Sequence, residues 1–165
     1  MALEIDTRVL IKNDNWKEFI TKKIFIEQGY LSKSIDDWII RIRFTGKDFK
    51  ITLKKHIESF TNFEFEYSIP QKDGETIMSN LSNTIKKERF FLEIEKKSWI
   101  IDCFKENNYP LEIAEIELSS EEEDLSLPSF ISKEITGLKY YYNLSLVNKP
   151  FSKWEKDYLT TLKKN

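Results

Sequence analysis

The feature of this 165-residue sequence that most constrains its fold is an alternation of polar and apolar residues with a period of two. Successive side chains of a β-strand point to opposite faces of a sheet, so this period predicts strands rather than helices. Eight segments rich in Ile, Phe, Tyr and Leu show it, at residues 3–11, 23–32, 38–45, 48–55, 61–69, 86–95, 98–104 and 111–118. Gly46-Lys47-Asp48 and Lys96-Lys97 lie where antiparallel hairpins should turn. We therefore expect an antiparallel sheet.

Helices are predicted in the gaps between these segments. Residues 14–21 and 73–82 each open on an aspartate, a residue that favours helix N-termini. Near the C-terminus an apolar stripe at helical spacing, formed by Trp154, Tyr158, Leu159 and Leu162, predicts a helix docked on the sheet. Only four glycines and four prolines are present, so we expect no flexible linker and a single α+β domain over residues 1–165.

The charge balance and the single cysteine narrow the class of protein. There are 26 basic and 28 acidic residues, for a formal net charge of −2, which does not favour whole-molecule attraction to nucleic acid or to an anionic membrane. No apolar run approaches the roughly 20 residues that span a bilayer. Cys103 cannot form an intrachain disulfide, and the N-terminus does not resemble a signal peptide. We expect a cytoplasmic protein.

The charged residues of the predicted strands form same-face pairs of one sign. Basic pairs stand at Arg41 with Arg43 and at Lys87 with Arg89; acidic pairs stand at Glu64 with Glu66 and at Glu115 with Glu117. A solvated sheet face explains any one pair, but such a face usually intersperses the two signs. If the sheet rolls up with its charges inward, acidic strands can hold a divalent metal through oxygen ligands and basic strands can hold phosphate oxygens.

The order and spacing of these motifs resemble the CYTH superfamily, also called triphosphate tunnel metalloenzymes, over nearly the whole chain. That superfamily includes inorganic triphosphatases, thiamine triphosphatases and class IV adenylate cyclases. The matching positions are Glu4, Asp6 and Arg8 for its opening E-x-E-x-K, Arg41 and Arg43 for R-x-R, Thr52 and Lys54 for T-x-K, Glu64 and Glu66 for E-x-E, Lys87 and Arg89 for K-x-R, Asp102 for a single acid, and residues 114–118 for A-E-I-E-L.

The resemblance implies an eight-stranded antiparallel β-barrel with covering helices, whose lumen binds a small triphosphate: inorganic triphosphate, ATP or thiamine triphosphate. The implied phosphate-binding residues are Arg8, Arg41, Arg43, Lys54, Lys87 and Arg89. The implied ligands of Mg²⁺ or Mn²⁺ are Glu4, Asp6, Glu64, Glu66, Asp102, Glu115 and Glu117. The opening motif, Glu4 with Asp6 and Arg8, is implied to be catalytic. We expect the protein to be a monomer or homodimer.

The chain departs from the family pattern at three positions. Asp6 replaces a Glu, Arg8 replaces a Lys, and Tyr140 stands where the closing stretch usually carries an Arg. Lys139 is adjacent, but on an extended strand a one-residue slip would point it the other way. These departures favour one alternative, a catalytically silent receptor for a phosphorylated ligand, whereas the retained acid pairs oppose it. Cyclisation of ATP is a second alternative to hydrolysis.

Two further residues with reactive side chains have simpler interpretations. His56 has no second histidine to share a metal with, and we expect it to be a solvated turn residue. Cys103 follows Asp102 on a strand where the neighbouring Ile101 and Phe104 are apolar, and no basic partner is evident in the sequence, so a buried, inert thiol is expected there.

Overall fold

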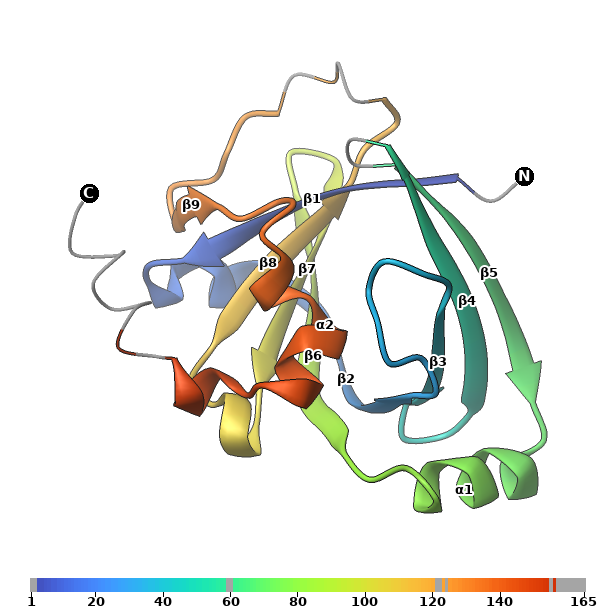
Figure 1. Ribbon diagram of the computed structural model, residues 1–165. Coiled ribbons are helices and arrows are strands. Elements are labelled where there is room, and N and C mark those ends of the chain that lie inside the picture. The colour runs from blue at the N-terminus through green and yellow to red at the C-terminus, as the bar shows by residue number, and fades with distance from the viewer. Residues whose placement is uncertain (1–2, 59–60, 121–122, 124, 155, 157–165) are drawn as a thin grey trace.

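Eight antiparallel strands close into a barrel in the computed structural model of the chain (Figure 1). The structure describes residues 3–58, 61–120, 123, 125–154 and 156. The barrel strands are β1 Leu3–Ile11, β2 Ile20–Tyr30, β3 Ile39–Phe44, β4 Phe49–Glu58, β5 Thr61–Ile69, β6 Thr84–Ile94, β7 Lys97–Phe104 and β8 Glu112–Glu117. Their order is β5-β4-β3-β2-β6-β7-β8-β1, and pairing of β1 with β5 closes the ring. The predicted barrel is confirmed, with each strand end within three residues of its predicted place.

The two predicted hairpin turns are present, and one of them begins a residue earlier than predicted. Gly46 adopts a φ of 83°, which glycine tolerates without strain, in the turn between β3 and β4. The turn between β6 and β7 is formed by Glu95 and Lys96, with φ values of 52° and 65°, one residue earlier than predicted. Two consecutive residues with positive φ are the signature of a type I′ turn, whose twist matches that of the flanking strands.

One strand was not predicted. β9, Ile131–Glu134, adds to the barrel by pairing with β1 beyond the stretch where β1 pairs with β5. It has only four residues, too few for an alternation to show.

The helices are short. They are η1 Asp14–Phe19, α1 Gln71–Ser79, η2 Glu106–Asn108, η3 Lys139–Tyr141, α2 Asn143–Asn148 and η4 Phe151–Lys153, where η marks a 3-10 helix. The two predicted helices are present as η1 and α1, although η1 is capped by Asn13, whose side chain accepts a hydrogen bond from the Asn15 backbone, and not by Asp14. Of the C-terminal stripe, Tyr158, Leu159 and Leu162 lie outside the described residues.

Two apolar layers hold the barrel together. The first lies on the outside of β1, β6, β7 and β8, where Trp16 of η1 and Phe130 cover the strand side chains. The second lies inside, where Leu10 and Ile113, on the inward faces of β1 and β8, meet Leu146 of α2. Because this second layer fills one end of the barrel with apolar side chains, polar inward residues are confined to the rest of the lumen.

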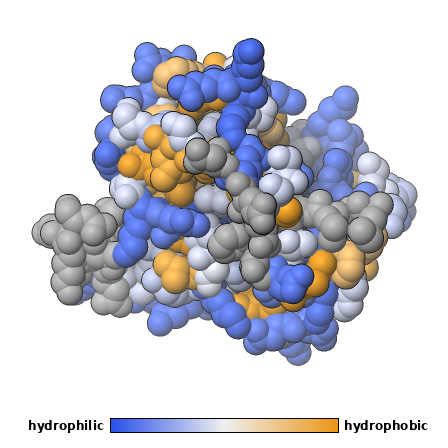
Figure 2. All heavy atoms as spheres, turned by 90° about the horizontal axis from the view of Figure 1, so that it is seen from above, coloured by the Kyte–Doolittle hydropathy of each residue, from blue (hydrophilic) through white to orange (hydrophobic). Residues whose placement is uncertain are grey.

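The surface is mostly hydrophilic in the view of Figure 2, with smaller hydrophobic areas between. This matches a chain in which 33% of residues are charged. None of the helices in the described ranges is long and apolar enough to cross a membrane.

Candidate active site

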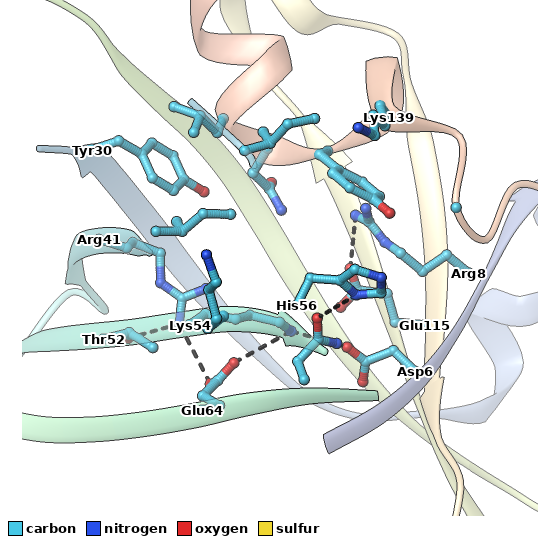
Figure 3. Close-up of a pocket in the computed structure, with 18 of the residues that line it drawn as sticks. Asp6, Arg8, Tyr30, Arg41, Thr52, Lys54, His56, Glu64, Glu115 and Lys139 are labelled. Carbon is cyan, nitrogen blue, oxygen red and sulfur yellow. Dashed lines mark hydrogen bonds and ion pairs between the residues drawn. The ribbon is translucent and has the colours of Figure 1, made fainter. Parts of the chain in front are cut away.

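The lumen of the barrel holds a cavity of about 420 Å³ whose walls carry charges of both signs (Figure 3). Side chains from β1, β3, β4, β5, β6 and β8 point into it, because alternate residues of each strand face inward. Among the sequence-predicted site residues, those that line the cavity are Asp6, Arg8, Arg41, Arg43, Lys54, Glu64, Arg89 and Glu115. The structure therefore brings together residues separated by more than a hundred positions in the chain.

Acids and bases of neighbouring strands are matched in register. Lys54 is opposite Glu64 in the pairing of β4 with β5, and its Nζ lies 3.4 Å from a Glu64 carboxylate oxygen. Arg8 is opposite Glu115 in the pairing of β1 with β8, and its Nη2 lies 2.8 Å from that carboxylate. The like charges that repel along each strand are thus partly neutralised across strands.

The two arginines of β3 are held in place by polar side chains of the two neighbouring strands, β4 and β2. Arg41 Nη2 donates to the hydroxyl of Thr52, 2.8 Å away. Arg43 Nε donates to Gln28 Oε1 at 3.3 Å, and Gln28 Nε2 donates to the Tyr30 hydroxyl at 2.6 Å. Gln28 is fully buried, so this chain of hydrogen bonds fixes the guanidinium before any ligand binds.

The inner part of the cavity carries more positive than negative charge. Five basic side chains (Arg8, Arg41, Arg43, Lys54 and Arg89) face three acidic ones (Asp6, Glu64 and Glu115). Burial, together with Arg41 and Arg89, lowers the pKa of Arg43 to about 9. Within the described part of the chain, the buried Nε groups of Arg8 and Arg41 have no hydrogen-bond acceptor. An anion with several oxygens would relieve both the repulsion and the unmet donors.

The environment of Asp6 disfavours the ionised form of its carboxyl group. Burial and the nearby Glu115 raise the pKa of Asp6, although Lys54, 3.2 Å away, opposes this. Burial alone would also raise the pKa of Glu115, but Arg8 and Arg89 lower it. No group of three or more His, Cys, Asp or Glu side chains in the described ranges is gathered closely enough to ligate one ion.

Lys87 and Asp102 lie behind the cavity wall and do not line it. Asp102 is fully buried and receives two hydrogen bonds from Arg89, at 2.7 and 2.8 Å, and one from Lys87 at 2.5 Å. Lys87 also donates to the side chain of Asn143 in α2, at 3.1 Å. This cluster, Lys87 with Arg89 and Asp102, orients Arg89 toward the cavity and ties the barrel wall to α2.

Stability should depend on pH through Lys87, because burial lowers the pKa of Lys87 to about 7 although Asp102 and Glu115 oppose the shift. Between that value and the roughly 10.4 of an unfolded lysine, the unfolded chain binds a proton that the folded chain lacks, so the free energy of unfolding rises with pH across this window. Denaturant titrations at pH 7 to 10 should show this rise, at most about 1.4 kcal/mol per pH unit, in the wild type and not in Lys87→Met. Equal pH slopes in the two proteins would refute the assignment.

The remaining predicted acids are Glu66, Glu117 and Glu4. Glu66 contacts Arg41 at 3.5 Å and Lys50 at 2.7 Å but does not line the cavity. Glu117 pairs with Asp6 in the sheet and is exposed at the end of β8. Glu4 pairs with Asn62 through the backbone, and its side chain lies outside the described residues.

Several residues that line the cavity were not predicted from the sequence, or were predicted to lie elsewhere. Lys139 lines the cavity, contrary to expectation, because residues 139–141 form a 3-10 turn and not an extended strand. His56 is exposed, but it lies on β4 and lines the cavity instead of occupying a turn. Thr52 lines the cavity, whereas Gln28 is buried and does not line it. Both could have been assigned to the site from the alternation, because Thr52 shares a strand face with Lys54 and Gln28 shares one with Tyr30. Asp36 and Asp37 follow no such signal because they belong to a loop.

Cys103 has the environment expected of an inert thiol. Its side chain is partly buried, and Sγ lies 3.5 Å from a carboxylate oxygen of Glu112. Burial and Glu112 together raise the pKa of the Cys103 thiol well above its ordinary value. The thiolate, which is the reactive form, is therefore disfavoured.

The chain is similar to known proteins along nearly all of its length. It is 30% identical over 157 residues to the inorganic triphosphatase of Acetivibrio thermocellus, covering 94% of this chain and 99% of that protein. Its fold is similar to the crystal structure of the inorganic triphosphatase NE1496, with a TM-score of 0.66 and 24% identity over 89% of this chain and 95% of that one. The fold is also similar to that of an adenylyl cyclase candidate from Hippeastrum with a dominant triphosphatase activity, with a TM-score of 0.56 and 13% identity over 74% of this chain and 81% of that one.

No family model matches the sequence. The identity to the curated relative, which extends over almost the whole of both chains, shows that this chain belongs to the CYTH, or triphosphate tunnel metalloenzyme, family.

Proposed function

We propose that the chain is an enzyme that hydrolyses a small triphosphate, releasing phosphate, with a divalent metal ion in the barrel lumen. The observation that carries this proposal is the excess of buried positive charge around the cavity, with carboxylates set between the bases. The name of the 30%-identical relative, inorganic triphosphatase, supports the same substrate class. Among triphosphates, inorganic triphosphate is the substrate we favour.

The basic residues are proposed to bind the phosphate oxygens. Arg41 and Arg43 present planar forks that suit two oxygens at once, whereas Lys54 supplies a point charge. Arg89 reaches the cavity from β6, which is separated from β3 by β2, and it is held by Asp102. Charges from several strands of the barrel wall would hold a linear triphosphate along the lumen and neutralise the charge that its terminal phosphoryl group redistributes during transfer.

The acidic residues fit a hard divalent cation such as Mg²⁺ or Mn²⁺. Their donors are all carboxylate oxygens, the ligands that such ions prefer. Mg²⁺ is commonly bound by one or two carboxylates together with substrate phosphates, so the lumen does not need a preformed cage of three acids. Glu64 and Glu115 are the acids that we propose as its ligands. When bound, the ion would neutralise phosphate charge and lower the pKa of a water molecule.

Hydrolysis requires a water oxygen to form a bond to the terminal phosphorus while the bond from that phosphorus to its bridging oxygen breaks. The products are phosphate and diphosphate, and the attacking water must lose a proton. Asp6 is the residue that we propose takes it, because its raised pKa brings this carboxylate closer to the value that suits a general base. Arg8, on the same face of β1, would bind the transferring phosphoryl group.

The proposal is tested by incubating the purified protein with inorganic triphosphate, ATP or thiamine triphosphate, each with Mg²⁺, with Mn²⁺ or with excess chelator. We expect phosphate release from inorganic triphosphate that chelation abolishes. Undiminished turnover in chelator would refute the metal requirement. Pyrophosphate and a cyclic nucleotide from ATP would indicate a cyclase instead, and tight binding without product under every metal would indicate a receptor.

We propose that the protein acts in the cytoplasm, on the ground of its single cysteine. We propose that it works as a monomer or homodimer, since the cavity is built from one chain.

A further inference from the structure

The loop between β2 and β3 lies across part of the cavity opening. Its residues Ile35, Asp36 and Asp37 line the cavity together with Lys139 of η3 and Lys55 of β4. In Figure 1 this blue loop lies between β4 and α2. Two acids from one loop thus meet two lysines from elements on either side of the opening.

The base of the loop is pinned to the barrel. The Ser32 hydroxyl donates to the Trp38 carbonyl at 2.6 Å and accepts from the Ile40 backbone N–H at 2.6 Å. The Leu31 N–H donates to the Ile40 carbonyl at 2.9 Å, which closes the loop at its neck. Motion of the tip at residues 33–37 therefore need not disturb the strands.

The tip of the loop is joined to the rim of the cavity by ionic contacts. Lys139 Nζ lies 2.8 Å from Asp36 Oδ1, and the pair raises the pKa of Lys139 and lowers that of Asp36. Lys55 Nζ lies 3.4 Å from Asp37 Oδ1 and 3.3 Å from the Asp36 carbonyl oxygen. The side chains of Lys139 and Asp36 are 65% and 72% exposed, so the bond between them is readily exchanged for another anion.

We propose that Lys139 is an additional substrate-binding residue, held by the Asp36 carboxylate until a polyphosphate enters and takes that place. The inference rests on the proposed function, because it assumes that the anion bound in the lumen is a polyphosphate. A triphosphate carries more charge than one carboxylate and is anchored by the lumen arginines, so it competes well for Lys139. A single phosphate, bound deeper, would leave the Asp36–Lys139 pair intact. Lys139 thereby favours longer phosphate chains over shorter ones, and its pairing with Asp36 offsets part of that preference.

Calorimetric titration of the metal-free protein with inorganic triphosphate and with inorganic phosphate tests this proposal. Asp36→Asn should bind triphosphate about twofold to fivefold more tightly, because its lysine is already released. Lys139→Gln should bind it more weakly by a similar factor, and the loss should be larger in the Asp36→Asn background, where no competitor exists. Phosphate affinity should change in neither variant.

Asp48→Asn is the matched control, since it removes the same charge from an exposed turn at the far end of β3. Equal affinities in Asp36→Asn and Asp48→Asn, or an unchanged affinity in Lys139→Gln, would overturn the proposal. Arg41→Ala in the same series separates the two hypotheses. If it weakens binding while the loop variants do not, only the role of Lys139 fails. If it has no effect either, the proposed phosphate site fails.

Discussion

Replacing Asp102 with Asn is expected to lower the free energy of unfolding by about 3–5 kcal/mol, because the substitution leaves buried cations without their counter-charge. Asp102 is 1% exposed and is the shared acceptor of Arg89 and Lys87. Lys87 can relieve part of the cost by losing its proton, whereas Arg89 keeps its charge. The melting temperature should fall by roughly 6–20 °C, at about 2–4 °C per kcal/mol for a chain of this size. Urea denaturation at pH 7 measures the loss directly.

The matched control is again Asp48→Asn, which changes the same atoms at an exposed turn and should alter the unfolding free energy by less than about 0.5 kcal/mol. If Asp102→Asn were equally mild, the cluster would not depend on the charge of Asp102. The folded barrel would then tolerate two adjacent buried bases, and the orientation of Arg89 would need another cause.

Replacing Arg41 with Ala should weaken the binding of inorganic triphosphate about 10-fold to 100-fold, because one charge-assisted contact is worth about 1.5–3 kcal/mol. Arg41 lines the cavity and is preoriented by Thr52, and its Nε lacks an acceptor among the described residues. The fold should change little, since Ile40 and Ile42 on the other face of β3 are untouched. Calorimetry without metal gives the affinity independently of turnover.

Lys47→Ala serves as the control for this prediction, because it removes one positive charge from the exposed turn after β3. A general electrostatic effect would weaken binding alike in both variants. A specific contact weakens it in Arg41→Ala alone. Equal binding by Arg41→Ala and the wild type would contradict the placement of the triphosphate in the lumen.

The fold could be predicted from the sequence because each barrel strand has one face toward the lumen and the other toward the apolar residues that cover the barrel. Because of that arrangement, polar and apolar residues alternate along each strand, as Arg41 and Arg43 alternate with Ile40 and Ile42. The same alternation identified most of the charged cavity wall. It could not show which bases meet which acids, since that depends on register between strands distant in the chain, such as Arg8 opposite Glu115.

The loop residues of the site were not predictable in this way. Asp36 and Asp37 lie in an irregular segment, where side-chain direction has no period, and Lys139 lies in a 3-10 turn that was expected to be a strand. The alternation also could not predict which inward side chains reach the cavity. Lys87 and Arg89 share a strand face, yet only Arg89 lines the cavity. Burial of Lys87 results from packing against Phe104 and Asn143, which are far from it in sequence.

The central claim, that the charged lumen binds and hydrolyses a triphosphate, is tested most directly by a crystal structure with a non-hydrolysable triphosphate and Mn²⁺. The predicted result is a phosphate chain inside the barrel, in contact with Arg41, Arg43 and Arg89, with the metal ion bound between its oxygens and carboxylates of the lumen. An anion bound only on the outer surface, with the lumen side chains paired as they are now, would contradict the account.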